Sequence, residues 1–218
     1  MTERGMIFNS EMVRAILEGR KTQTRRPIKW KQTRFTEIGE REDGSKWPWS
    51  EDAEHACDFW HPCPFGAVGD RIWVRETFTG HYLDDDQIQD IKDGRDKASS
   101  LCEYRADYPD GYQAADGWTP SIHMPRWASR ILLEITDVRV ERLNAISEED
   151  AEAEGIDMEA LYDSQDCYDC IADHNMTGRP TVTGAFKYLW ESIYGEEGWK
   201  SNPWVWVIEF KRVEGGEA

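Results

Sequence analysis

Three stretches of the chain have the pattern of polar and apolar positions that is typical of a helix. In residues 11–18 the apolar side chains fall on one face, and Gly19 is placed to end the helix. Residues 186–193 repeat the same apolar spacing. Ser147, followed three residues later by an acidic side chain, predicts a short helix that closes at Gly155.

Strand patterns lie between these helices and near the end of the chain. Residues 72–78 alternate so that every second side chain faces the same side, and residues 130–140 do the same. A short strand is predicted within residues 103–107. Residues 204–210 are apolar on both faces, which predicts a central strand and not an edge strand. Together these elements predict a mixed α+β fold.

Three long segments interrupt this pattern. Residues 31–63 are rich in Gly, Pro, Trp and charge, and they predict a long loop. Residues 80–100 are acidic without apolar periodicity, which favours a mobile insertion over a part of the core. Residues 157–183 form another insertion. The length of 218 residues fits a single globular domain that carries these three insertions, and we find no internal repeat.

Acidic residues outnumber basic ones, and the balance is uneven along the chain. There are 43 Asp and Glu against 26 Lys and Arg, for a net charge of −17. Residues 1–35 hold nine Lys or Arg against three acids, a balance of +6, so the rest carries −23. An acidic body opposes extensive contact with a nucleic-acid backbone, so RNA binding should be weak. No apolar run is long enough to span a bilayer and no signal peptide begins the chain, so we expect no membrane partner and a cytoplasmic location.

The basic residues concentrate in the segment from Gly19 to Arg26, which holds one lysine, three arginines and two threonines. Positive neighbours and burial both favour the neutral form of Lys21, and a neutral lysine is a base. A nearby hydroxyl such as that of Thr24 is then a candidate nucleophile. The two side chains can cooperate only if residues 21–26 depart from a regular strand, so we predict a turn or bulge there. A solvated basic turn without chemistry is the alternative.

The pattern Gly19-x-Lys21-x-x-x-x-Arg26 resembles the signature of the ASCH superfamily, whose members are related to the RNA-binding PUA domains. Its fuller form, Gly-Arg-Lys-Thr-x-Thr-x-Arg, is similar to the bacterial N4-acetylcytidine amidohydrolases of that superfamily. Residues 69–75, 147–156 and 204–210 match further segments in chain order. The stretch 118–130 and the long insertions look more like the larger ASCH proteins of phages and prophages.

This resemblance implies both a fold and an activity. The implied fold is mostly β, a PUA-like open β-barrel with flanking helices. The implied activity is hydrolysis of the amide at N4 of acylated cytidine or a related nucleoside, with no cofactor for catalysis. The superfamily also leaves open a noncatalytic RNA-binding module, a ribonuclease, or an accessory protein whose site has lost its activity.

Carried onto this sequence, the resemblance implies Thr24 as nucleophile, Lys21 as the base and Glu154 as the acid that serves the leaving group. Thr24 orienting a water molecule is the alternative to a covalent ester. The sequence also gives one reason, apart from the resemblance, to consider Glu154 as an acid. The end of its helix and four acidic neighbours favour a protonated carboxyl. Most glutamates in an acidic helix are solvated, which is the plain alternative.

Substrate-binding candidates follow from the same comparison. Arg26 is predicted either to stabilise the oxyanion or to form a structural ion pair. Trp73 and Trp127 are candidates for stacking on a pyrimidine, while most of the eleven tryptophans should be core residues.

The cysteines pose a separate question. Cys167 and Cys170 have the separation of metal ligands, and Cys57 with Cys63 gives a looser second pair. A structural Zn²⁺ held by these four residues would tie two insertions together; ordinary thiols are the alternative. Cys102 has no partner in either case.

Overall fold

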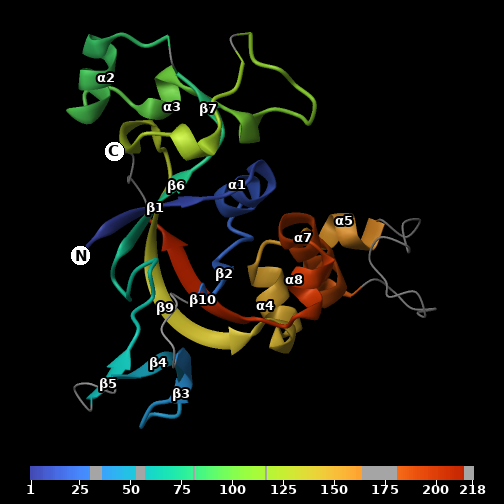
Figure 1. Cartoon of the computed structure of the whole chain (residues 1–218). Helices are drawn as coiled ribbons and strands as arrows, with labels where there is room; N and C mark the ends of the chain where they lie inside the picture. Colours follow the sequence, from blue (N-terminus) through green and yellow to red (C-terminus); the bar gives the residue numbers. More distant parts are fainter. Residues whose placement is uncertain (30–35, 53–56, 81, 116, 164–180, 214–218) are drawn as a thin grey trace. The chain divides into compact units, whose positions relative to one another are not determined.

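The computed structural model describes residues 1–29, 36–52, 57–80, 82–115, 117–163 and 181–213 (Figure 1). The chain divides into two compact units that are each discontinuous in sequence. Unit 1 consists of Met1–Gly19, Val68–Thr136 and Phe210–Ala218, and unit 2 of Arg20–Ala67 and Asp137–Glu209. A single domain with three insertions stays a prediction. No helix in the described part of the chain is long and apolar enough to cross a membrane.

The described chain contains both strands and α-helices. The strands are β1 (Glu3–Ile7), β2 (Gln23–Pro27), β3 (Thr36–Glu40), β4 (Lys46–Asp52), β5 (Cys57–Trp60), β6 (Arg71–Arg75), β7 (Phe78–Thr79), β8 (Glu103–Tyr104), β9 (Leu132–Arg142) and β10 (Trp204–Arg212). The α-helices are α1 (Ser10–Leu17), α2 (Asp85–Lys92), α3 (Ala98–Leu101), α4 (Glu148–Ala153), α5 (Met158–Asp163), α7 (Val182–Tyr194) and α8 (Glu196–Lys200). Short 3₁₀ helices lie at Arg105–Asp107, Ser121–His123, Arg126–Ala128 and Leu143–Ala145.

The strands form three sheets. The largest has the order β1-β6-β9-β10-β2, with β1 parallel to β6 and the pairs β6–β9 and β10–β2 antiparallel. Strand β10 therefore has a neighbour on each side, as its two apolar faces predicted, and β2 lies at the edge. The other sheets are β3-β4-β5 and β7-β8. The mixed α+β class is confirmed, and within the described residues these sheets do not close into a barrel.

Local sequence signals place the predicted helices correctly. The Asn9 side chain accepts a hydrogen bond from the Met12 amide at the start of α1, and Ser147 accepts one from Asp150 at the start of α4. Gly19 follows α1 with a φ of 78°, a left-handed conformation that glycine adopts without strain. These caps need only neighbouring residues, which is why the sequence alone locates them.

The prediction of a long loop over residues 31–63 is wrong for the part that is described. Strands β3, β4 and β5 pair antiparallel there. The β3–β4 connection contains Asp43-Gly44, with Gly44 at a φ of 81°, and Asp-Gly is a strong hairpin signal. Trp47 then packs edge-on against Trp206 of β10, with ring centroids 5.0 Å apart. The tryptophans of this segment thus belong to a small sheet.

Residues 80–100 also differ from the prediction, because they contribute to the core. Asp84 caps α2 by accepting a hydrogen bond from the Gln87 amide. Ile91 and Ala98 are fully buried. Two well-placed apolar residues in a polar segment are too few to give a periodic signal, yet they suffice to dock two short helices.

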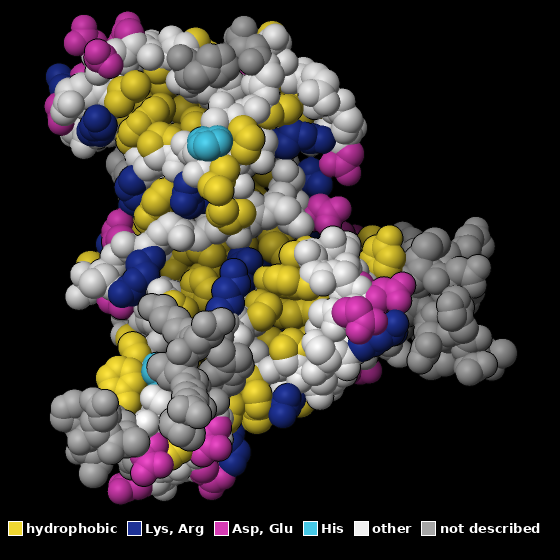
Figure 2. Space-filling model, in the orientation of Figure 1, with side chains coloured by type: hydrophobic (Ala, Val, Ile, Leu, Met, Phe, Trp, Pro, Cys, Tyr) yellow, Lys and Arg dark blue, Asp and Glu magenta, His cyan; other side chains and the backbone are white. Residues whose placement is uncertain are grey.

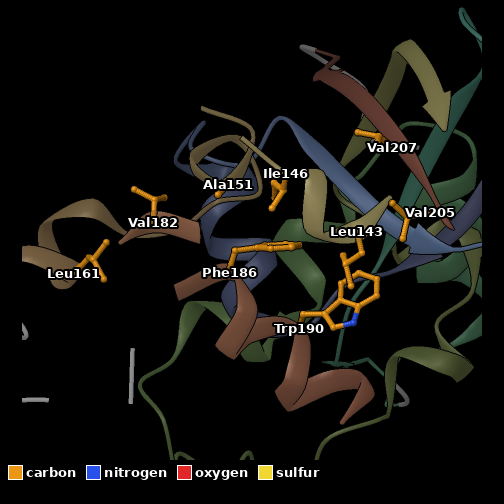
Figure 3. Close-up of a cluster of buried hydrophobic side chains, with 9 residues drawn as sticks. All are labelled: Leu143, Ile146, Ala151, Leu161, Val182, Phe186, Trp190, Val205 and Val207. Atoms are coloured by element: carbon orange, nitrogen blue, oxygen red, sulfur yellow. The ribbon is translucent and has the colours of Figure 1, made fainter. Parts of the chain in front are cut away.

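Unit 2 has a core that joins β10 to the helices. Phe186 and Trp190 of α7 point toward Leu143, Ile146 and Val205 (Figure 3). The complete cluster of buried residues is Leu143, Ile146, Ala151, Leu161, Val182, Phe186, Trp190, Val205 and Val207. Because Ala151 is fully buried in this cluster, α4 is anchored with its end beside the start of β2.

Candidate active site around Lys21 and Glu154

The segment that leads into β2 runs beside the end of α4. Lys21 forms an isolated antiparallel bridge with Glu154, and the Thr22 amide donates to the Ala153 carbonyl at 2.9 Å. Glu154 is the C-terminal cap of α4. The fold thus brings together two residues that lie 133 positions apart in the sequence. Strand β2 begins only at Gln23, so residues 21–26 do not form one regular strand.

Lys21 and Glu154 form a buried ion pair. The Lys21 ammonium donates to Oε2 of Glu154 and to its backbone carbonyl, both at 2.7 Å. The Lys21 side chain has no exposed surface, and the Glu154 side chain is 4% exposed. An amine and a carboxylate at this distance in a dry environment can exchange a proton directly.

Burial is the largest influence on the pKa of Lys21 and lowers it from its ordinary value of 10.5. The charge and the hydrogen bond of Glu154 oppose this effect, and the nearby charges of Arg26 and Arg25 add to it. The net direction is downward, so the structure favours the neutral amine more than water does. The sequence predicted the same direction for the pKa of Lys21, from burial and from positive neighbours.

Arg25 is the second cation on Glu154. Its side chain is fully buried, and Nη1 donates to Glu154 Oε1 at 3.3 Å. Its Nη2 donates to Asp150 Oδ2 at 3.0 Å and to Glu141 Oε2 at 3.2 Å. The carboxylate of Glu154 is therefore held at one oxygen by Lys21 and at the other by Arg25.

Arg139 of β9 extends these contacts. It donates to Asp150 Oδ1 at 2.9 Å and to Glu141 Oε1 at 2.7 Å, and it pairs with Glu209. Burial raises the pKa of Asp150, but Arg25 and its other partners outweigh burial and hold the value below its usual range. We call seven of the connected side chains the ion cluster; its members are Lys21, Arg25, Arg139, Glu141, Asp150, Glu154 and Glu209.

Thr24 and Arg26 lie on the opposite face of β2 from Arg25, because side chains alternate along a strand. Thr24 is 2% exposed and pairs across the ladder with Ile208, and Arg26 pairs with Trp206. Lys21 precedes the strand, and the charges of both Arg25 and Arg26 act on its amine. Charges on both faces of β2 therefore act on Lys21, which lies just before the strand.

The two tryptophans predicted to bind substrate belong to unit 1, whereas Lys21 and Glu154 belong to unit 2. The Trp73 ring lies against Gly5 so closely that a Cβ at Gly5 would stand 2.5 Å from it. The Arg75 guanidinium is 5.4 Å from the centre of the same ring. Trp127 packs against the buried cluster of Phe78, Cys102, Tyr104, Met124 and Ala128. Both side chains therefore have packing roles, and stacking on a pyrimidine stays a prediction.

The zinc prediction falls largely outside the described residues. Cys167 and Cys170 are not described, nor is the side chain of Cys57, while Cys63 is buried. Within the described part of the chain, no group of three or more His, Cys, Asp or Glu is placed to hold a metal ion. A structural Zn²⁺ stays a prediction.

Sequence reasoning missed Arg25 and Asp150, although simple spacing points to both. Arg25 follows Lys21 by four residues within the same basic segment, so both side chains can reach one acidic partner. Asp150 precedes Glu154 by four residues, which places both on one face of a helix. These two spacings identify the facing charges once it is known that β2 and α4 are neighbours.

Comparisons with known proteins add no family assignment. No family model, no curated protein and no solved structure matches the chain.

Proposed function

We propose that this chain is a hydrolase of the PUA-like ASCH type that removes acyl groups from N4 of acylated cytidine or a related nucleoside. The buried contact between Lys21 and Glu154 carries this proposal. The resemblance of the sequence to the amidohydrolases implies these two residues as base and acid, and a 2.7 Å hydrogen bond joins them. Buried titratable pairs with a shifted pKa are frequent at catalytic sites.

Lys21 and Glu154 can supply both proton transfers of amide hydrolysis. Neutral Lys21 accepts the proton of the nucleophile as the nucleophile bonds to the acyl carbon. The bond between that carbon and N4 then breaks, and Glu154 delivers a proton to the leaving nitrogen, which becomes the amino group of cytidine. The hydrogen bond between the two residues returns the proton from Lys21 to Glu154. If Thr24 is the nucleophile, the acyl group remains on its oxygen as an ester; water then attacks the ester and gives a proton to Lys21, and the Thr24 oxygen takes a proton back as the carboxylic acid leaves. On either route water is the net reactant, and a carboxylic acid and cytidine are the products.

The nucleophile is either the Thr24 hydroxyl or a water molecule. Thr24 is buried beside Arg26 on one face of β2, and Lys21 stands at the start of that strand. Arg26 in turn is the guanidinium placed to stabilise an oxyanion on the Thr24 face. Thr24→Val separates the two routes, since valine keeps the shape of threonine and removes the hydroxyl. A loss as large as that of a Lys21 variant assigns the attack to Thr24, and near-normal turnover assigns it to water.

The direct test is to incubate the purified protein with N4-acetylcytidine and to follow the release of cytidine by chromatography. Labelled single-stranded RNA, tested in parallel for cleavage and binding, addresses the alternative of an RNA-binding module or ribonuclease. Figure 2 shows acidic side chains gathered over α2, in line with the net charge of −17. RNA binding should therefore be weak and sensitive to salt. Tight, salt-resistant binding without deacylation would reject the hydrolase in favour of the binding module.

The pH dependence of deacylation gives a further prediction. Turnover should rise with pH through the titration of Lys21, at a pH below 10.5, because only the neutral amine accepts a proton and its pKa is lowered. A fall at higher pH would report the loss of the proton that the pair delivers to N4. Any apparent pKa read from the profile belongs to the coupled pair and not to either residue. The measurement is kcat across the pH range in which tryptophan fluorescence shows an intact fold; a flat profile would contradict proton transfer by this pair.

A further inference from the structure

Arg25 occupies a position in the ion cluster that the proposed chemistry does not yet use. Its guanidinium is fully buried and contacts three acidic side chains of unit 2. These partners are Glu141 of β9, Asp150 of α4 and Glu154 at the end of α4. The Phe186 ring of α7 lies 5.9 Å from the guanidinium carbon, so an aromatic ring is also beside the guanidinium.

The two oxygens of the Glu154 carboxylate accept hydrogen bonds from two different cations. Lys21 holds Oε2 and can lose its proton, whereas Arg25 holds Oε1 and stays charged at any ordinary pH. In the proposed cycle the proton that Lys21 gives up passes to Glu154, and Glu154 is a carboxylate again once it has protonated N4. Arg25 then stays beside it as a buried positive partner. Without Arg25, the Glu154 carboxylate would depend on Lys21 alone for a compensating charge, and burial strongly opposes a carboxylate that loses its compensation.

We infer that Arg25 is a positioning residue: as a fixed counter-charge it holds the Glu154 carboxyl group in place and compensates its charge whenever it is ionised, so that Lys21 can release and regain its proton. The kinetic part of this inference rests on the proposed function, while the electrostatic part does not. Arg25 acts through Glu154 and contacts no reacting atom in this scheme.

The charged groups around Lys21 determine the sign of the expected effect. Glu154 at the end of α4 attracts the ammonium form, and Arg25 and Arg26 of β2 repel it. Asp150 and Glu141 face Arg25 and neutralise part of its charge. Removing Arg25 therefore removes a positive charge that repels the Lys21 ammonium. It also makes Lys21 the one remaining cation of the ion cluster that is bonded to the Glu154 carboxylate. Both changes favour the protonated amine, so Lys21 should titrate at higher pH.

The experiment compares Arg25→Met with the wild-type chain by two readouts. The first is the titration of the Lys21 amine, followed by NMR of ¹³C-labelled lysine side chains and assigned with a Lys21→Met spectrum. The second is the rising limb of the pH–rate profile for N4-acetylcytidine. We expect the titration midpoint of Lys21 to be higher in Arg25→Met by about one pH unit or more. The rising limb of the pH–rate profile should move to higher pH by a similar amount.

Arg139→Met is the matched control. Arg139 belongs to the same ion cluster and bonds Asp150, Glu141 and Glu209, and no bond from it to Lys21 or Glu154 is present among the described residues. Both variants should lower the melting temperature, but only Arg25→Met should move the Lys21 midpoint. An unmoved midpoint in Arg25→Met, or an equal shift in Arg139→Met, overturns the inference.

Arg25→Lys covers the case in which Arg25→Met does not fold. A lysine keeps the charge but cannot bridge three carboxylates, so kcat should fall by about tenfold or more while the rising limb stays near its wild-type pH. Full activity in this variant would reject a positioning role. If the Lys21 midpoint is shifted in Arg25→Met but the wild-type chain shows no deacylation, the proposed function is rejected and the role of Arg25 as a fixed counter-charge stays supported.

Discussion

Replacement of Lys21 by Met should lower kcat for N4-acetylcytidine hydrolysis by about 10²–10⁴-fold, the usual contribution of a positioned base. Lys21→Met removes the amine and keeps a long side chain in the space that the lysine fills. Glu154 retains Arg25 as its partner, at 3.3 Å, so the variant does not leave an uncompensated carboxylate. The fold should therefore survive while the chemistry is lost, and steady-state kinetics with a thermal melt measures both.

Glu154→Gln should cause a loss of similar size, because an amide cannot deliver a proton to N4. The matched control is Glu141→Gln, which applies the same substitution to another carboxylate on Arg25. Glu141 does not take part in the proposed proton transfers, so kcat should stay within a few-fold of the wild type. The double variant of Lys21 and Glu154 should be no worse than either single variant, since residues that act as a unit are not additive. Near-normal turnover in either single variant would reject the assigned roles.

Replacement of Arg130 by Met should lower the free energy of unfolding by about 3–5 kcal/mol, the cost of breaking a buried ion pair from one side. Arg130 donates to both oxygens of Glu76, at 3.0 and 3.1 Å, and the Glu76 side chain is only 2% exposed. Its guanidinium also lies 3.9 Å from the centre of the Tyr104 ring. Loss of the arginine leaves Glu76 buried without its partner. Urea unfolding followed by tryptophan fluorescence gives the value.

Asp107→Asn is the control, because Asp107 binds the same guanidinium from a side chain that is 44% exposed. An exposed partner contributes little, so the loss should stay within about 1 kcal/mol. The pH dependence has a definite sign as well. Burial raises the pKa of Glu76 above 4.5, and Arg130 opposes this effect. Without Arg130 the pKa rises further, so the folded state binds the proton more tightly than the unfolded state does. The penalty of Arg130→Met should therefore be smaller at pH 5 than at pH 8; an equal penalty would mean that Glu76 is not its source.

Local signals in the sequence were sufficient for several of the regular elements, among them α1, α4, α7, β9 and β10. Helix α1 is defined by Asn9 and Gly19, which act on residues within one turn. The central position of β10 follows from apolar residues on both of its faces, since only a strand covered on both sides tolerates them. The small sheet β3-β4-β5 was missed although Asp43-Gly44 marks its first turn, because its strands are short and rich in Trp and charge.

The sequence by itself determined that Lys21 stands in a basic segment at a helix exit, and the resemblance singled out Glu154. Only the tertiary structure decided that the two are in contact, that Arg25 shares the carboxylate, and that Thr24 and Arg26 lie on the other face of β2. The physical reason is that a buried charge selects its partner by strand order and helix packing. With 43 acidic residues in the chain, composition leaves the partner of Lys21 open, and the docking of α4 beside the start of β2 selects one of them.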